Sequence, residues 1–101
     1  MNFERAGESG DERKANDSLD ALDAELEALH EARKLRRLQL MMSMVMSVIS
    51  QDPDLTLEEA AEMSANARRA ALTMFPDKEL AYDIIYRPRL QRLMNERFRL
   101  Q

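Results

Sequence analysis

The chain has 101 residues, of which 45% are hydrophobic and 34% are charged, and its net charge at neutral pH is −4. This composition excludes a disordered chain, and the absence of cysteine excludes disulfides, thiolate metal sites and a cysteine nucleophile. Only two glycines and three prolines are present, so turn signals are few and long helices are favoured over many short strands. We therefore expect an all-α protein.

The N-terminal segment holds both glycines and is rich in charge. Residues 1–10 predict a flexible acidic tail, and residues 11–101 predict a single helical domain that starts between Asp11 and Ser18. No apolar segment of the kind found in a secretory signal peptide precedes this domain. The longest apolar stretch, residues 38–49, is shorter than the ~20 residues that a membrane span needs. These features favour a cytoplasmic protein with no membrane association.

The first predicted helix covers about residues 17–50. Its first half is acidic and carries leucines at spacings of three, four and three residues, as in a coiled-coil seam. We call this row the leucine seam: it consists of Leu19, Leu22, Leu26 and Leu29. At ~1.5 Å per residue the helix would measure ~50 Å, which is more than the rest of so short a chain can cover. Its length therefore predicts that the chain pairs with itself, as a symmetric homodimer or a higher oligomer.

The second half of this helix carries its own row of apolar residues at the same kind of spacing: Leu35, Leu38, Met42, Val45 and Ile49. The step of six residues from Leu29 to Leu35 interrupts the heptad, so we expect the two halves to face different partners. After Leu40, apolar residues cover most of the circumference, which predicts that the helix is buried nearly all round.

Two shorter helices are predicted to follow. Pro53 ends the first helix, and Thr56-x-x-Glu59 is typical of a capping box that opens a helix over about residues 57–74. After Pro76, with Asp77 as a candidate N-cap, a third helix is expected over about residues 78–99. Pro88 lies inside it and predicts a kink near residues 84–87. The three helices should form a bundle that dimerisation completes.

Two sets of residues are candidates for binding. Rows of apolar residues and a pair of tyrosines beside the kink suit a protein interface, and the candidate interface residues are Leu19, Leu22, Leu26, Leu29, Met42, Met46, Tyr82 and Tyr86. Two basic clusters suit an anion or an acidic partner, and their candidate residues are Arg33, Lys34, Arg36, Arg37, Arg87, Arg89 and Arg92. The pI of about 5.0 disfavours nucleic acid, so we expect these cations to pair with acids of the protein or of a partner.

Metal chemistry has little support. Glu27-x-x-His30 has the spacing found in di-iron bundles, but those sites need a second motif, and His30 is the only histidine. The methionines of residues 41–46 could be thioether ligands for Cu(I), yet they point in several directions on a helix and suit a core or an adaptable interface better. We expect no cofactor and no metal.

A long first helix followed by two shorter ones resembles the plan of the small all-helical chorismate mutases, which form intertwined dimers. The resemblance covers the helix order only. It would imply an active site with several basic residues, including a lysine far along the first helix, and a glutamine in the last helix. Here the first helix has no lysine after Lys34, and Gln91 is the only glutamine well inside the last predicted helix.

No catalytic motif and no glycine-rich phosphate loop is present in the sequence. We therefore predict a non-enzymatic helical interaction or oligomerisation module, an adaptor or scaffold whose first partner is itself and whose second candidate partner is another protein. The alternative is a small nucleic-acid-binding regulator that uses the arginine clusters at residues 33–37 and 87–99. A chorismate-mutase-like enzyme is a remote further alternative.

Overall fold

A computed structural model describes the backbone of residues 2–99 and the side chains of residues 13–99. Four helices make up this part of the chain: α1 (Asn2–Gln51), α2 (Leu57–Met74), α3 (Glu79–Ile85) and α4 (Arg87–Phe98). No strand occurs among the described residues, so the all-α prediction is confirmed. The chain forms two compact units, Met1–Arg33 and Lys34–Gln101.

The first unit consists of the N-terminal part of α1. This helix begins at Asn2, before the window from Asp11 to Ser18 in which the sequence places its start. Asn16 and Asp17, which lie within that window and could each cap a helix, are therefore inside α1, where Ala, Leu and Glu on either side continue it without a break. That residues 1–10 form a flexible tail in solution stays a prediction.

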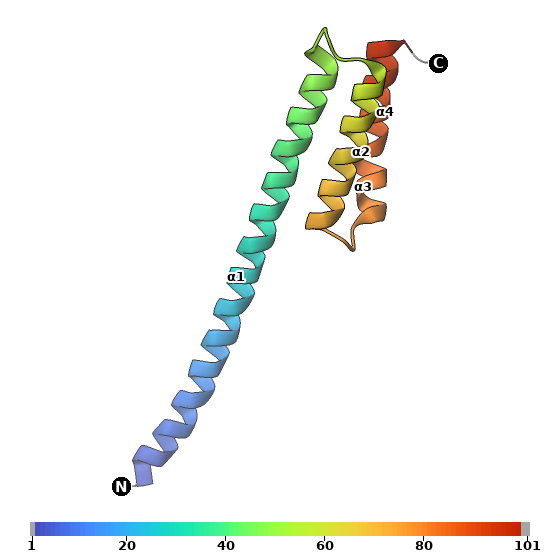
Figure 1. Ribbon diagram of the computed structural model, residues 1–101. Coiled ribbons are helices and arrows are strands. Elements are labelled where there is room, and N and C mark those ends of the chain that lie inside the picture. The colour runs from blue at the N-terminus through green and yellow to red at the C-terminus, as the bar shows by residue number, and fades with distance from the viewer. Residues whose placement is uncertain (1, 100–101) are drawn as a thin grey trace. The chain divides into compact units, whose positions relative to one another are not determined.

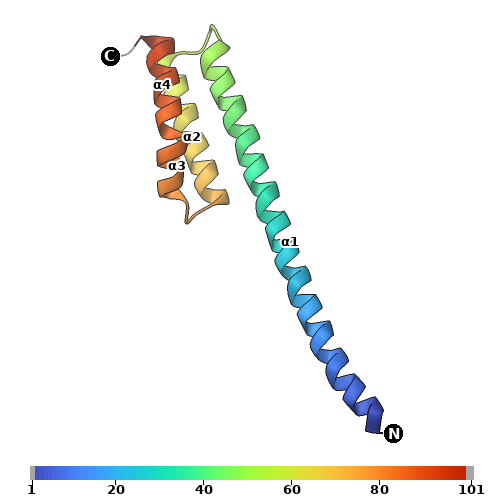
Figure 2. The ribbon, with the colours of Figure 1, turned by 180° about the vertical axis from the view of Figure 1, so that it is seen from behind.

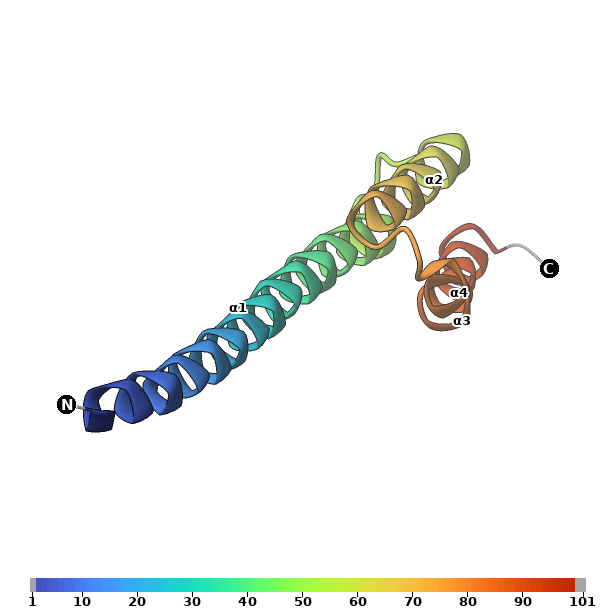
Figure 3. The ribbon, with the colours of Figure 1, turned by 90° about the horizontal axis from the view of Figure 1, so that it is seen from below.

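The second unit is a bundle of the last part of α1 with α2, α3 and α4. Within it α2 runs antiparallel to α1, and α3 and α4 return in the direction of α1 (Figure 1). Seen from behind, α3 and α4 follow each other along nearly one line (Figure 2). Figure 3 shows the bundle from below. In this view, α3 and α4 overlap each other, and both lie to one side of α2.

The connection from α1 to α2 is built as the sequence predicts. The amide of Asp54 donates to the side chain of Asp52 at 3.0 Å, which makes a tight turn around Pro53. The hydroxyl of Thr56 accepts from the Glu59 amide at 3.1 Å, and the Glu59 carboxylate accepts from the Thr56 amide at 3.2 Å. This reciprocal capping box starts α2 at Leu57, so the predicted capping box and the predicted bounds of this helix are confirmed.

The third predicted helix is divided in two. The division falls at Tyr86, inside the predicted kink region, because Pro88 has no amide proton with which to continue the helical ladder. The amide of Tyr86 still donates to Tyr82, and the amide of Leu90 donates to Tyr86. The helix starts at Glu79, and Lys78 holds the N-cap position without a side-chain hydrogen bond, so the prediction of Asp77 as the cap was wrong.

The core of the second unit is apolar and draws on all four helices. From α1 come three residues of the predicted row, and α2 contributes three alanines, which let the helices approach closely. The buried residues of this core are Leu38, Met42, Ile49, Leu55, Ala60, Ala67, Ala71, Tyr82 and Leu90. Tyr82 carries a hydroxyl group; apart from it, no polar or charged side chain is buried among the described residues.

Burial on α1 is confined to one side, contrary to the prediction of burial nearly all round. Met42 is 0% exposed, whereas Leu40 and Met44 are each 64% exposed. The reason is geometric: α2 and α3–α4 pack on the face that carries Leu38, Met42 and Ile49, and residues half a turn away face outward. Apolar residues on the outward face are therefore available for other contacts.

Candidate interaction surfaces

The leucine seam lies on the first unit and is exposed along its whole length. Leu19, Leu22, Leu26 and Leu29 are between 47% and 58% exposed. The spacing of three and four residues places them on one face of α1. Four half-exposed leucines on one face form an apolar stripe about ten residues long, which is the arrangement that a second helix covers in a coiled coil.

Charged residues flank the leucine seam. If Leu19 and Leu26 are heptad positions a, Glu25 lies at g, and Asp23 and His30 lie at e, the positions that border a coiled-coil seam. The pair Glu27 and His30 belongs to no cluster of metal-ligating side chains, because residues 13–99 contain no group of three or more His, Asp or Glu placed to hold a metal ion. The residues around the seam therefore suit pairing of side chains between helices.

Met42 and Met46, candidate interface residues from the sequence, are both used within one chain. Met42 is completely buried, and Met46 packs against the core from a half-buried position. The most exposed apolar residues of this part of α1 are Leu40 and Met44, which the sequence does not single out as interface residues. A helical wheel centred on the row of Leu38, Met42 and Ile49 would have placed them outside.

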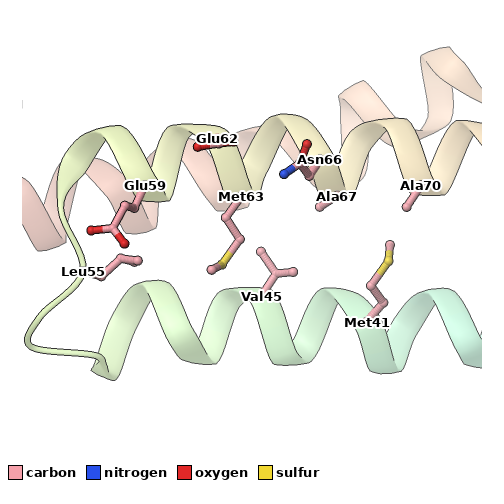
Figure 4. Close-up of a pocket in the computed structure, with 9 residues that line it drawn as sticks. All are labelled: Met41, Val45, Leu55, Glu59, Glu62, Met63, Asn66, Ala67 and Ala70. Carbon is pink, nitrogen blue, oxygen red and sulfur yellow. The ribbon is translucent and has the colours of Figure 1, made fainter.

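A groove runs along the second unit between α1 and α2. Met41 and Val45 of α1 form one wall, and Met63, Ala67 and Ala70 of α2 form the other (Figure 4). Leu55, in the α1–α2 connection, closes one end. Most of these side chains are only partly buried, so the floor of the groove is an apolar surface that solvent reaches.

The edge of this groove that α2 forms is polar, and it is acidic at the end near Leu55. Glu59, Glu62 and Asn66 line that edge, and Figure 4 shows their side chains along the α2 side. The carboxylate of Glu59 is engaged in the capping box, whereas no interaction within residues 13–99 involves Glu62. Further along, Asn66 accepts a hydrogen bond from Arg69. The acidic charge is therefore concentrated at one end of the groove.

The two candidate tyrosines belong mainly to the bundle. Tyr82 is buried, and its hydroxyl lies 3.9 Å from the sulfur of Met42. This burial raises the pKa of Tyr82, because the phenolate would lose its hydration. The ring of Tyr86 lies 5.6 Å from that of Tyr82, with the guanidinium of Arg89 5.9 Å above it. Of the two tyrosines, Tyr86 is the one that is partly exposed and could contact a partner, together with Arg89.

An ion cluster that the sequence does not point out joins α2 to α3. The guanidinium of Arg68 donates to both carboxylate oxygens of Asp83, at 3.0 and 3.1 Å, and to Glu79 at 2.6 Å. Arg68 holds the pKa of Asp83 below its usual value, and the two carboxylates raise the pKa of Arg68. Nothing in the local sequence distinguishes Arg68 from its neighbour Arg69, since the pairing depends on how α3 returns along α2.

The first basic cluster is partly used for folding. The ammonium group of Lys34 donates to the carbonyl oxygen of Met74 at 3.2 Å and lies 4.8 Å from the centre of the Phe75 ring. A cation at the end of α2 satisfies a carbonyl group that has no helical donor, and it complements the helix dipole. Arg33, Arg36 and Arg37 are exposed.

The second basic cluster faces outward on α4. Arg87, Arg89 and Arg92 are all exposed. Arg87 and Arg92 line a shallow hollow together with Asp83, Pro88, Gln91 and Asn95. Because an acid lies in the same hollow, this face is a mixed polar surface and not a uniformly positive one.

No protein-family model, curated protein or solved structure matches this chain. None of the helices in the described part of the chain has the length and apolar character of a membrane span.

Proposed function

We propose that the protein is a non-enzymatic helical interaction module that self-associates through the leucine seam. The observation that carries the proposal is the exposure of four leucines at seam spacing on one face of α1. Single exposed leucines are ordinary on protein surfaces, but a continuous stripe of them is typical of an interaction site. A second copy is the occupant that fits best, because an isologous contact lets one stripe cover itself.

The expected dimer is weak. Covering a half-exposed leucine contributes about 1 kcal/mol, so the eight leucines of two stripes contribute about 8 kcal/mol. Association costs about 4 to 15 kcal/mol in lost freedom of motion, which is of the same size. The net gain is then at most about 4 kcal/mol, so a seam of about two heptads suits reversible association at concentrations approaching about 1 mM.

The charges beside the seam favour a parallel arrangement. In a parallel pair, a g residue lies near the e residue five positions later in the other helix, so Glu25 would lie near His30 of the partner subunit. In an antiparallel pair with the leucines aligned, Glu25 would lie near the partner's Glu25 and Asp23 near the partner's Asp23. Arg33, at the next a position, would face its own copy in the parallel pair and so ends the seam there.

Sedimentation equilibrium of the full chain between about 10 µM and about 1 mM tests self-association. The double variant Leu22→Gln, Leu26→Gln should remain monomeric where the unsubstituted protein dimerises. The matched control is Ala24→Gln, Ala28→Gln, which changes the opposite face of the same helix and should dimerise normally. A monomeric mass for the unsubstituted protein over the whole range would refute the proposal.

A further inference from the structure

We propose that the groove between α1 and α2 docks a short amphipathic helix of another protein, one that carries apolar side chains on one face and lysine or arginine along the edge of that face. The groove and the leucine seam lie in different units of the chain and differ in their flanking charge. The inference therefore concerns a second partner and does not depend on self-association.

The floor of the groove suits an apolar helix face. Met41 and Met63 lie on opposite walls, and their flexible thioether side chains can adapt to differently shaped side chains. Ala67 and Ala70 leave room for a partner side chain to come close to the backbone of α2. The lining residues of α2 extend from Glu59 to Ala70, or about 16 Å, which matches about three helical turns of a partner.

The apolar surface does not stop at the wall of the groove. Met44 lies three residues after Met41 on α1 and is 64% exposed, and Leu40 is exposed to the same extent. A helix resting in the groove would also cover part of this ridge. The floor and the ridge together resemble the grooves in which peptide helices bind through apolar anchors at positions i, i+3 or i+4, and i+7.

The charge of the rim selects the partner. The carboxylate of Glu59 already accepts a hydrogen bond in the capping box. Glu62 lies beyond the first turn of α2 and has no interaction within the described residues. A carboxylate beside an apolar floor favours a lysine or arginine that flanks the apolar face of the partner. Because Arg69 occupies the other end of the α2 edge, the basic part of the partner should lie at the end near Leu55.

The same charge argues against a second copy of this chain in the groove. The longest exposed apolar stripe among the described residues is the leucine seam, and residues 13–31 around it carry six acids against two bases. Placing that helix beside Glu59 and Glu62 would bring like charges together. A basic helix from a different protein is therefore the better match.

The test uses the full chain and a fluorescent synthetic peptide of about 16 residues with leucines on one face and lysines on its edges. Fluorescence anisotropy should give a dissociation constant of about 10 to 100 µM that rises with salt. Glu62→Lys should weaken binding about fivefold or more, because it replaces an attraction with a repulsion. Glu96→Lys makes the same charge change on α4 and should alter binding less than twofold.

A second variant and two further peptides make the result decisive. Ala70→Arg, with its fold checked by circular dichroism, should block the groove and abolish binding. A peptide of the same composition with its leucines scattered around the helix, and one with glutamates in place of lysines, should both bind at least tenfold more weakly. Equal losses in Glu62→Lys and Glu96→Lys, undiminished binding of either control peptide, or no binding at all would overturn the proposal.

The leucine-seam variant separates the two proposals. Leu22→Gln, Leu26→Gln should bind the basic peptide with unchanged affinity if the groove is the site. A loss of peptide binding in this variant would place the peptide on the leucine seam and overturn the inference, whatever the outcome for self-association.

Discussion

The guanidinium of Arg97 donates a hydrogen bond of 2.7 Å to the carbonyl oxygen of Asp52, a residue 45 positions earlier in the chain. The bond joins the last turn of α4 to the turn that follows α1. Lys34 makes a similar link to the carbonyl of Met74 at the end of α2. In both cases a cation from one helix satisfies a carbonyl group at the C-terminal end of another, where the helix dipole favours positive charge.

Replacing Arg97 should therefore destabilise the bundle. Arg97→Ala removes a charged donor from a partly buried carbonyl, and we expect the free energy of unfolding to fall by about 1 to 2 kcal/mol. Urea denaturation followed by circular dichroism measures the change. Arg92→Ala, at an exposed arginine of the same helix, should stay within about 0.5 kcal/mol of the unsubstituted protein. Equal effects at the two sites would show that the link to Asp52 is unimportant.

The difference in burial between Met42 and Met44 gives a second prediction. Met42→Ala leaves a cavity at a completely buried site and should cost about 2 to 5 kcal/mol of unfolding free energy. Met44→Ala makes the same chemical change at a site that is mostly exposed, and should cost less than about 0.5 kcal/mol. Urea titrations of the two variants compare them directly. Similar losses would mean that the packing face of α1 is assigned wrongly.

The pairing of Asp83 with Arg68 makes stability depend on pH. The pKa of Asp83 is lower in the folded protein than in the unfolded chain, where it is about 3.9. The folded state therefore gains stability from this carboxylate above pH ~4, and the gain is lost as the pH falls through the lowered folded pKa. Asp83→Asn should lower the urea midpoint at pH 7, and its difference from the unsubstituted protein should shrink towards pH 3. A difference that is constant with pH would contradict the role of the charge.

Because the sequence has no cysteine, the direction of the proposed dimer can be tested with a single introduced thiol. Ala15 lies four residues before Leu19, at the preceding seam position, so a parallel pair places both copies of this residue side by side. Ala15→Cys should form a disulfide-linked dimer under mild oxidation, which non-reducing electrophoresis detects. Ala24→Cys, on the opposite face, should not. Dimerisation without cross-linking of Ala15→Cys would indicate an antiparallel pair.

The nucleic-acid alternative has its own prediction. The exposed arginines of α4 share their surface with Asp83, and the chain carries a net charge of −4. We therefore expect no measurable binding of a random-sequence DNA duplex at about 50 mM salt. Binding that falls steeply with added salt and is lost in the triple variant Arg87→Ala, Arg89→Ala, Arg92→Ala would instead favour a nucleic-acid-binding regulator.

Local signals in the sequence predict the helix boundaries well where a side chain makes the boundary. Thr56 and Glu59 specify the start of α2, and Pro88 specifies the break at Tyr86, because each acts within one turn of the backbone. The start of α1 was predicted less well, since no residue between Asp11 and Ser18 opposes helix formation and the helix continues back to Asn2.

The surfaces could be predicted only in part. The row containing Leu38, Met42 and Ile49 identifies the packing face of α1, but the richness of the same segment in methionine suggested burial on every side, and Met44 is exposed. The link between Arg68 and Asp83 depends on the path of α3 along α2, which no local pattern encodes. The groove was missed for the same reason, because its two walls come from helices whose pairing is known only after folding.

Apart from the contact of the Tyr82 hydroxyl with the Met42 sulfur, the described core has no buried polar or charged pair, and this has a consequence for how the protein can change over evolution. Leucine, isoleucine and methionine can replace one another in such a core at a cost that is usually below about 1.5 kcal/mol, as long as the total volume is kept. The alignment of the helices would then depend on three cations at the margin of the core, Lys34, Arg68 and Arg97. We expect distant relatives of this chain to differ widely in their apolar residues and to keep a positive charge at these three positions.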